Sequence, residues 1–220
     1  FENEKSGQFP DTKWKINNLG RGWVLGETLI TGIGQGYTQT TPIQLCLMTA
    51  QIANGGYKIT PKILTDDNRL TSEQVKRAML NNNNDKPFEK LFKEQKNIKI
   101  VQDSMFGSTN ELRGTSYKSR IDDPKYQFAG KTGTAQVKRI SKRERELDLK
   151  TSQIPYEERD HALYVAFGPY KNPRYSLSII VEHGGSGSSA AAPMATKLFK
   201  LIIDRHELRK QVSDFKEFNI

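Results

Sequence analysis

Four consecutive residues, Lys131 to Thr134, place a cation, two hydroxyls and a bare glycine backbone next to one another. In an extended strand, successive side chains alternate between two faces, so we expect Lys131 and Gly133 on one face and Thr132 and Thr134 on the other. Glycine weakens a strand interior, which favours a position where another molecule approaches the backbone closely. A glycine-interrupted surface strand without a ligand is the alternative. The segment is therefore the candidate catalytic and binding site of this sequence.

Three motif classes compete for these residues. A phosphate-binding loop ends in Gly-Lys-Ser/Thr, as residues 130–132 do, but its first glycine position holds Lys125. A dinucleotide-binding fingerprint fails as well, because residues 32–37 lack the last glycine and open no βαβ unit. The third class is the Lys-Thr-Gly element of penicillin-binding proteins and serine β-lactamases, which residues 131–134 satisfy.

Other stretches extend this match. The chain resembles the C-terminal part of the transpeptidase domain of class B penicillin-binding proteins, most closely the penicillin-binding protein 2 type of rod-shaped bacteria. The matching stretches follow the family's order and cover about two-thirds of the chain: residues 23–26, 32–37, 41–44, 53–56, 130–136, 161–169 and 181–192. Residues 65–99 and 138–158 lie outside the resemblance.

The resemblance implies acyl transfer. In the family, a serine attacks the D-Ala-D-Ala bond of a peptidoglycan stem peptide, forms an acyl-enzyme and passes the acyl group to an amine of a neighbouring stem; β-lactams mimic the dipeptide. Lys131 would place positive charge near the serine hydroxyl and the substrate carboxylate, to which Thr132 and Thr134 would donate. The backbone of Gly133 and Thr134 would pair with an extended peptide, and the Thr134 N–H would be one of two oxyanion donors.

The nucleophile itself is missing from this sequence. Residues 213–216 match Ser-x-x-Lys and residues 108–110 match Ser-x-Asn, but we interpret both as chance matches. In the family the nucleophile comes first and Lys-Thr-Gly last, whereas Ser213 follows the last element, in a polar C-terminal tail that offers no cleft for a serine nucleophile. We therefore expect the isolated chain to be inactive, as part of a longer protein whose nucleophile lies upstream. A penicillin-recognising sensor or a β-lactamase relative remains an alternative.

Charge and composition select no partner. The 220 residues carry 34 Lys and Arg against 25 Asp and Glu, for a formal net charge of +9, which suits nucleic acid, anionic lipid or another anionic polymer equally well. The cations are scattered without interleaved aromatic residues, so we expect no nucleic-acid binding, and a basic polymer-binding domain is the competing hypothesis. Cys46, His161, His183 and His206 show no metal-ligand spacing, so no metal or cofactor is expected.

No apolar run approaches the roughly 20 residues of a membrane-spanning helix. The resemblance nevertheless implies a full-length protein anchored in the bacterial inner membrane, with this domain facing the periplasm. It also implies peptidoglycan stem peptides, β-lactam antibiotics and cell-wall elongation proteins as partners.

The elements that must position the site predict an α+β fold with a three-stranded antiparallel sheet and packed helices. The resemblance implies that this is the remnant of a partial transpeptidase (serine β-lactamase-like) domain. We divide the single domain into a connector and buried helix (1–64), a variable helical insert (65–99), the active-site strand, sheet and C-terminal helix (100–206), and a polar tail (207–220). Expected strands cover residues 131–137, 161–169 and 175–182, with a helix over 190–203.

The first part of the chain carries its own signals. Residues 1–22 have few periodic apolar positions and predict an irregular connector. Thr41, Pro42 and Gln44 predict the start of a helix that continues as a buried, almost wholly apolar body over residues 43–53 and closes at Gly55 and Gly56. Residues 57–64 predict a surface strand, and the insert predicts two helices, the second with Phe88, Leu91 and Phe92 in its apolar stripe. Ile98, Val101 and Met105 recur at helical spacing, so we expect them to pack onto the core.

Overall fold

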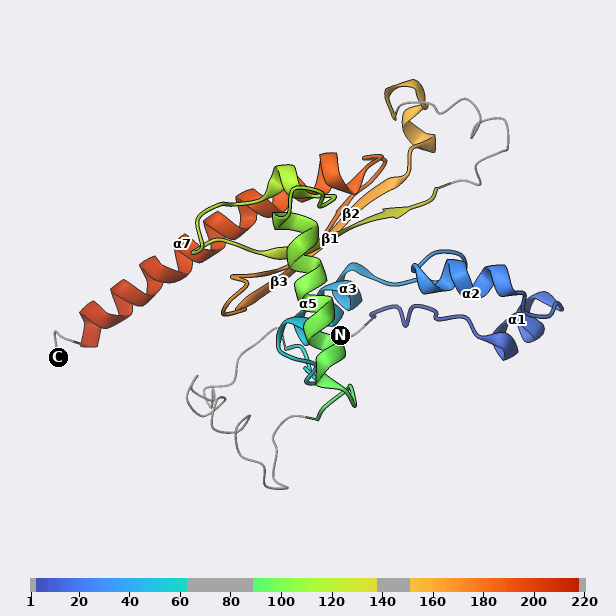
Figure 1. The fold of residues 1–220 in the computed structure, drawn as a ribbon, viewed down its shortest axis with the longest axis horizontal. Helices are drawn as coiled ribbons and strands as arrows, with labels where there is room; N and C mark the ends of the chain where they lie inside the picture. Colours follow the sequence, from blue (N-terminus) through green and yellow to red (C-terminus); the bar gives the residue numbers. More distant parts are fainter. Residues whose placement is uncertain (1–2, 63–88, 138–150, 218–220) are drawn as a thin grey trace. The chain divides into compact units, whose positions relative to one another are not determined.

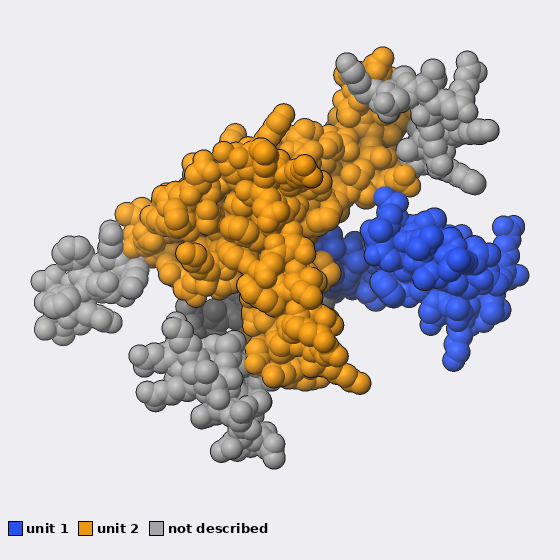
Figure 2. Space-filling model, in the orientation of Figure 1, with its two compact units in different colours: residues 1–45 blue, residues 46–220 orange. Residues whose placement is uncertain are grey.

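The computed structural model describes residues 3–62, 89–137 and 151–217. The chain divides into two compact units, Phe1–Leu45 and Cys46–Ile220, which Figure 2 distinguishes by colour. The larger unit contains the sheet and the candidate site.

Helix α1 (Thr12–Leu19) corrects the prediction of an irregular connector over residues 1–22. The Asp11 carboxylate accepts a hydrogen bond from the Trp14 N–H at 2.6 Å, and Gly20 ends the helix in the left-handed conformation. Both ends of this two-turn helix are therefore capped locally, and caps stabilise a helix whose apolar periodicity is weak.

Helix α2 (Leu25–Gly32) starts with a second capping interaction, because Glu27 Oε2 accepts from the Val24 N–H at 2.8 Å. The same carboxylate forms an ion pair with Lys15, with Nζ 2.5 Å from Oε1. The hydrogen bond from Lys15 holds the pKa of Glu27 below its usual range. This pair ties α1 to α2 inside the first unit.

Helix α3 (Pro42–Ala53) begins and ends as its sequence predicts. The Thr41 N–H donates to Gln44 Oε1 at 3.0 Å, the Gln44 N–H reaches Thr41 Oγ1 at 3.3 Å, and Gly55 and Gly56 follow with positive φ. The predicted burial of its body is wrong: Thr49 alone is fully buried, and most of the helix is half-buried. The strand predicted after it is also wrong within residues 57–62, where an isolated bridge joins Tyr57 to Lys90.

The three predicted strands are confirmed. Strands β1 (Ala129–Ala135), β2 (His161–Gly168) and β3 (Tyr175–Val181) form an antiparallel sheet in the order β1-β2-β3. Figure 1 shows them side by side, with α5 crossing near β1. Within the described residues no further strand pairs with the outer edge of β1 or of β3.

Each face of the sheet carries its own core. On one face, Tyr164 and its neighbours on β2 pack against helix α7 (Ala192–Glu217), which follows a π-helical turn, η4 (Gly187–Ala191). On the other face, Ala129 and Phe167 pack against Met105. Helix α7 continues to Glu217, into the polar tail expected after residue 206.

Helix α5 (Gln95–Asn110) supplies Met105 to that second core and crosses the sheet beside β1. Ile98 and Met105 are buried as their spacing predicts, whereas Val101, from the same stripe, is 41% exposed. The second helix of the predicted insert is wrong where it is described, because residues 89–94 are not helical. The rest of that prediction, over residues 63–88, lies outside the described residues.

Candidate active site

Strand β1 presents the four site residues as the alternation predicts. Lys131 is paired with Val165 and Thr132 with Tyr164, which places the two side chains on opposite faces of the sheet. Lys131 and Thr134 are exposed, whereas Thr132 and Gly133 are half-buried. Strand pairing with β2 thus fixes the backbone of the segment while leaving its cation and one hydroxyl accessible.

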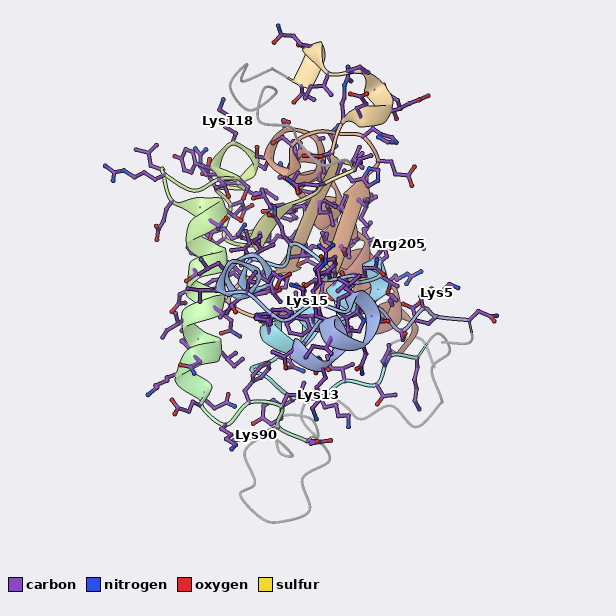
Figure 3. All side chains as sticks on the ribbon, turned by 90° about the vertical axis from the view of Figure 1, so that its right-hand side faces the viewer. Lys5, Lys13, Lys15, Lys90, Lys118 and Arg205 are labelled. Atoms are coloured by element: carbon purple, nitrogen blue, oxygen red, sulfur yellow. The ribbon has the colours of Figure 1, made fainter. Side chains whose placement is uncertain are left out.

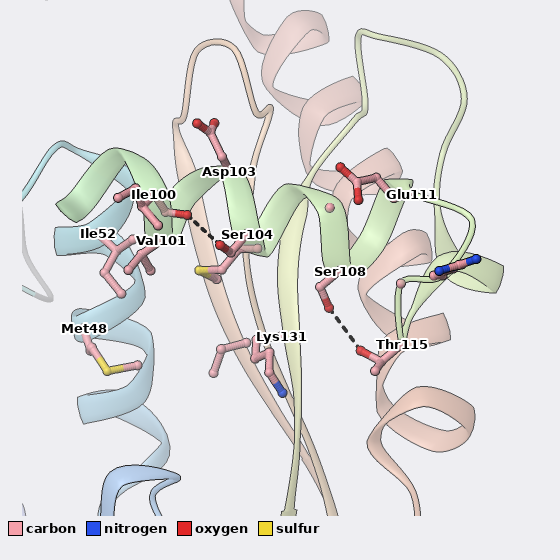
Figure 4. A pocket seen from close by; sticks show the side chains of 15 residues that line it. Met48, Ile52, Ile100, Val101, Asp103, Ser104, Ser108, Glu111, Thr115 and Lys131 are labelled. Carbon is pink, nitrogen blue, oxygen red and sulfur yellow. Dashed lines mark hydrogen bonds between the residues drawn. The ribbon is translucent and has the colours of Figure 1, made fainter. Parts of the chain in front are cut away.

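Lys131 lies at a groove of about 930 Å³ that follows helix α5. Figure 4 shows Lys131 on β1 between the α3 side chain of Met48 and the hydrogen-bonded pair Ser108 and Thr115. The Lys131 ammonium donates to the carbonyl of Thr132 at 2.7 Å. The apolar side chains that line the groove are Met48, Ile52, Ile100, Val101, Met105 and Val165. Its polar lining consists of Asp103, Ser104, Ser108, Glu111, Arg113, Thr115 and Lys131.

The outer edge of β1 is closed at its start and open further along. The Asn110 side-chain amide, at the end of α5, donates to the Phe128 carbonyl at 2.9 Å, so this carbonyl points away from β2. In an antiparallel strand the backbone groups of alternate residues point to the same side. The N–H and C=O groups of Thr132 and Thr134 therefore face the edge that β2 leaves unpaired, and those of Gly133 face β2.

A buried cluster of hydroxyl groups is centred on Tyr164, the β2 residue that is paired with Thr132 of β1. The Tyr164 hydroxyl lies 2.9 Å from Thr109 Oγ1 and 3.0 Å from Ser116 Oγ, and all three side chains are buried. Burial raises the pKa of Tyr164, so its phenol stays protonated at neutral pH. A Cβ at Gly130 would lie 2.3 Å from the Tyr164 hydroxyl, so glycine there makes room for the ring.

Sequence reasoning missed this cluster, because its members are separated by 55 and 48 positions along the chain. The one available signal was the glycine directly before Lys131, which the motif alone does not require. Ser108 and Asn110 lie inside helix α5, where Asn110 fastens the helix to β1. The Asn110 of this Ser-x-Asn match therefore has a structural contact, the hydrogen bond to the Phe128 carbonyl.

The histidines have structural contacts in the described chain. His161 Nδ1 accepts a hydrogen bond from the His183 N–H at 2.9 Å, and His183 Nδ1 lies 3.1 Å from the Arg159 carbonyl. Among residues 3–62, 89–137 and 151–217, no group of three or more His, Cys, Asp or Glu side chains could hold a metal ion. Nor is any helix in these ranges both long enough and apolar enough to cross a membrane.

Positive charge is distributed over separate elements. Figure 3 labels Lys5, Lys13 and Lys15 of the first unit, and Lys90, Lys118 and Arg205, which precede α5 or lie in η1 (Tyr117–Ser119) and α7. Several cations are already matched by carboxylates: ion pairs form between Lys15 and Glu27, Lys58 and Glu89, Lys99 and Asp103, and Lys125 and Asp204. Among residues 3–62, 89–137 and 151–217, the cations labelled in Figure 3 lie on several elements rather than along one element, as a continuous basic stripe would require.

An edge strand carrying Lys-Thr-Gly in an α+β domain defines the class of penicillin-recognising acyl-transfer domains. The chain belongs to the penicillin-binding protein transpeptidase domain family, which it matches over residues 1–200. The relatives include the peptidoglycan D,D-transpeptidase MrdA of Salmonella typhimurium, which is 33% identical over 91% of this chain. The MrdA protein of Haemophilus influenzae is 30% identical over 100% of this chain. The chain spans 31% and 32% of these two relatives.

Solved structures agree with this assignment. Penicillin-binding protein 2 of Pseudomonas aeruginosa, in complex with WCK 5153, has a TM-score of 0.67 and 35% identity over 91% of this chain and 38% of its own. The Helicobacter pylori protein, in complex with MreC, has a TM-score of 0.67 and 31% identity over 94% of this chain and 32% of its own. The predicted family and fold class, a penicillin-binding protein 2 type transpeptidase domain, are confirmed.

Proposed function

We propose that this chain forms the C-terminal part of a peptidoglycan D,D-transpeptidase, which cross-links stem peptides through a serine acyl-enzyme. The observation that carries the proposal is the position of Lys131 to Thr134, on the strand edge that β2 leaves unpaired and beside the groove along α5. A segment with a cation, two hydroxyls and backbone groups that face away from β2 suits an extended peptide that ends in a carboxylate.

The substrate carboxylate is anchored by charge and hydroxyl groups. Lys131 contributes a positive charge at the groove, and Thr132 and Thr134 contribute hydroxyl donors on either side of Gly133. Hydrogen bonds to an ionised acceptor are stronger than those between neutral groups, so these three side chains orient the carboxylate end of the substrate.

The backbone of β1 supports strand addition. The outward N–H and C=O groups of Thr132 and Thr134 lie two residues apart, as pairing with an extended peptide requires. The Thr134 N–H is then available as one oxyanion donor, while Gly133 serves by its lack of a side chain. The expectation that Gly133 pairs through its own backbone is revised by this alternation.

The serine comes from the longer protein. Its hydroxyl oxygen bonds to the carbonyl carbon of the penultimate D-alanine, the peptide nitrogen takes up a proton, and the terminal D-alanine leaves. An amine of the acceptor stem then attacks the ester carbonyl, releases the serine hydroxyl and completes the cross-link. We propose that the Ser-x-x-Lys element of the longer protein lies beside Lys131, near the groove.

Location and partners belong to the same proposal. We place the full-length protein at the bacterial inner membrane with this domain in the periplasm, where stem peptides are found and where β-lactams would acylate the serine. Elongation proteins are proposed as partners of the full-length protein; a complex with MreC is described for the Helicobacter pylori relative.

Labelling with a fluorescent penicillin tests the function. The full-length protein is expected to be labelled covalently, and Lys131→Ala is expected to slow acylation about a hundredfold or more, because a preorganised charge is lost at the reacting end of the substrate. Ser213→Ala is the matched control and leaves the rate unchanged, since Ser213 follows the motif in the chain. The isolated 220-residue chain stays unlabelled.

Labelling of the isolated chain that disappears with Ser213→Ala would make the tail serine the nucleophile and overturn the proposal. Rapid hydrolysis of the acyl-enzyme in the full-length protein would favour the β-lactamase alternative, whereas a stable adduct supports the transpeptidase. An unlabelled full-length protein that binds DNA with a steep salt dependence would favour the basic polymer-binding alternative.

A further inference from the structure

Residues 114–116 form a turn that the proposed function leaves without a role. We propose that Thr115 is a positioning residue, which holds the hydroxyl of Thr132 in the orientation needed for the substrate carboxylate. This inference rests on the proposed function of Lys131 to Thr134, and it assigns a role to a residue outside that motif.

Thr115 connects α5 to the site through its hydroxyl. Thr115 Oγ1 lies 3.1 Å from Ser108 Oγ on α5 and 3.4 Å from Thr132 Oγ1 on β1. Thr115 is exposed and lines the groove together with Lys131. A hydroxyl group can both donate and accept a hydrogen bond. The hydroxyls of Ser108, Thr115 and Thr132 can therefore form a chain of hydrogen bonds in which Thr115 is the defined partner of Thr132.

The turn that carries Thr115 is fixed to the end of α5. Ser108 O accepts hydrogen bonds from both the N–H and the hydroxyl of Ser116, each at 3.0 Å. A Cβ at Gly114 would lie 2.4 Å from the same carbonyl oxygen, so only glycine lets the turn approach this closely. Thr115 is thus held on both sides by residues with a backbone contact to α5.

The buried hydroxyl cluster holds the same turn from the sheet side. Ser116 Oγ lies 3.0 Å from the Tyr164 hydroxyl, and Tyr164 is the partner of Thr132 in the β1–β2 register. The residue after Thr115 and the strand partner of Thr132 are therefore joined directly. Because the backbone of both threonines is fixed, their side-chain contact can restrict the Thr132 rotamer at little further entropic cost.

A pair of substitutions in the full-length protein separates the hydroxyl from the shape of the side chain. Thr115→Val keeps the branched shape and removes the hydroxyl, and we expect it to lower the second-order acylation rate by a fluorescent penicillin roughly two- to tenfold, the range of one net hydrogen bond. We expect the penicillin concentration that gives half of the maximal acylation rate to rise, while the acylation rate at saturating penicillin is nearly unchanged. Thr115→Ser keeps the hydroxyl and should restore the rate to within about twofold.

A double-mutant cycle tests whether the effect acts through Thr132. In a Thr132→Val background, Thr115→Val should have no further effect, because the group that it positions is gone. Full additivity of the two substitutions would overturn the proposal, since Thr115 would then act on the substrate or the fold independently. Failure of Thr115→Ser to rescue the rate would overturn it as well.

Threonine-methyl NMR of the full-length protein keeps this inference separate from the proposed function. Thr115→Val should shift the Thr132 methyl signal and average its side-chain couplings toward several rotamers, whether or not the protein reacts with penicillin. An unlabelled wild-type protein contradicts the transpeptidase proposal, whereas an unchanged Thr132 signal in Thr115→Val contradicts the positioning role alone.

Discussion

Individual residues around β1 divide into those that are exposed on the strand and those that fix it from within the core. Lys131 and Thr134 are exposed, whereas Tyr164, Thr109 and Ser116 are buried and hydrogen-bonded to one another. Buried polar groups are costly unless they are paired, so this cluster is stable only as a complete set. The cluster is structural: it holds β2, and with it the paired strand β1 that carries the motif, in a fixed position relative to α5.

Gly130→Ala tests this support at the scale of one residue. The added Cβ would meet the Tyr164 hydroxyl at 2.3 Å and its Cζ at 2.5 Å, so either the ring or the strand must move. We expect the free energy of unfolding, measured in urea, to fall by about 1–3 kcal/mol, as for other overpacked cores. Gly22→Ala is the control, because no atom lies within 4 Å of its Cβ position; an equal loss in both variants would contradict the steric argument.

Among the helices, α5 has the most contacts with the site. It caps the start of β1 through Asn110, lines the groove and carries Ser108. Its other side is tied to Tyr170, just beyond β2, by Asp103 and Lys99: Lys99 Nζ lies 2.7 Å from Asp103 Oδ1, and the Tyr170 hydroxyl donates to the same oxygen. The position of α5 therefore depends partly on one carboxylate.

The stability contributed by Asp103 should depend on pH. Hydrogen bonds from Lys99 and then from Tyr170 hold the pKa of Asp103 below its usual range. A carboxyl group with a lowered folded-state pKa stabilises the fold above its unfolded pKa of about 4, and this contribution is lost as the pH falls through the folded value. Asp103→Asn should therefore lower the Tm at pH 7, and its difference from wild type should shrink below about pH 4.

Tyr170→Phe is the matched comparison. It removes one of the two hydrogen bonds to Asp103 and leaves the Lys99 pair in place, so its pH-dependent loss should be smaller than that of Asp103→Asn. Thermal melts across pH 3 to 8 measure both variants. A difference between Asp103→Asn and wild type that is the same at both ends of this range would show that the ion pair does not hold α5.

Exposed apolar side chains and unpaired strand edges occur together in the part of the chain that the structure describes. Large apolar side chains with high exposure occur in both units, among them Phe9 and Leu25 at 78% and Leu201 at 65%. The outer edges of β1 and β3 also lack a strand partner among the described residues. Unpaired strand edges and exposed apolar groups both favour association with another chain.

We therefore expect the isolated chain to associate as its concentration rises, which sedimentation velocity measures directly. Ile180→Lys places a charge on edge strand β3, where Ile180 is 39% exposed, and should reduce association. Leu208→Lys makes the same change on α7, away from the sheet, and serves as control. Equal effects of the two variants would assign association to apolar surface in general, and a monomer at all concentrations would refute the expectation.

The sequence by itself determined the local features of this protein. The Lys-Thr-Gly element, the alternation along residues 161–182 and the reciprocal Thr41–Gln44 cap each depend on residues a few positions apart, and each is found where predicted. The family assignment followed from such short motifs in their order. The short helix α1 was missed because it depends on its caps, and α7 proved longer because its polar continuation after residue 206 still forms helical hydrogen bonds.

Only the tertiary structure decided what surrounds the motif. The contacts of Tyr164 with Thr109 and Ser116, and of Thr115 with Thr132, join residues 55, 48 and 17 positions apart. Hydroxyl side chains carry no periodic signal that would pair them in advance, since their partners are set by how α5 packs across β1. Which edge of β1 stays unpaired among the described residues was likewise fixed by pairing with β2 and by the Asn110 cap, because a strand's own sequence specifies alternation but not which edge stays free.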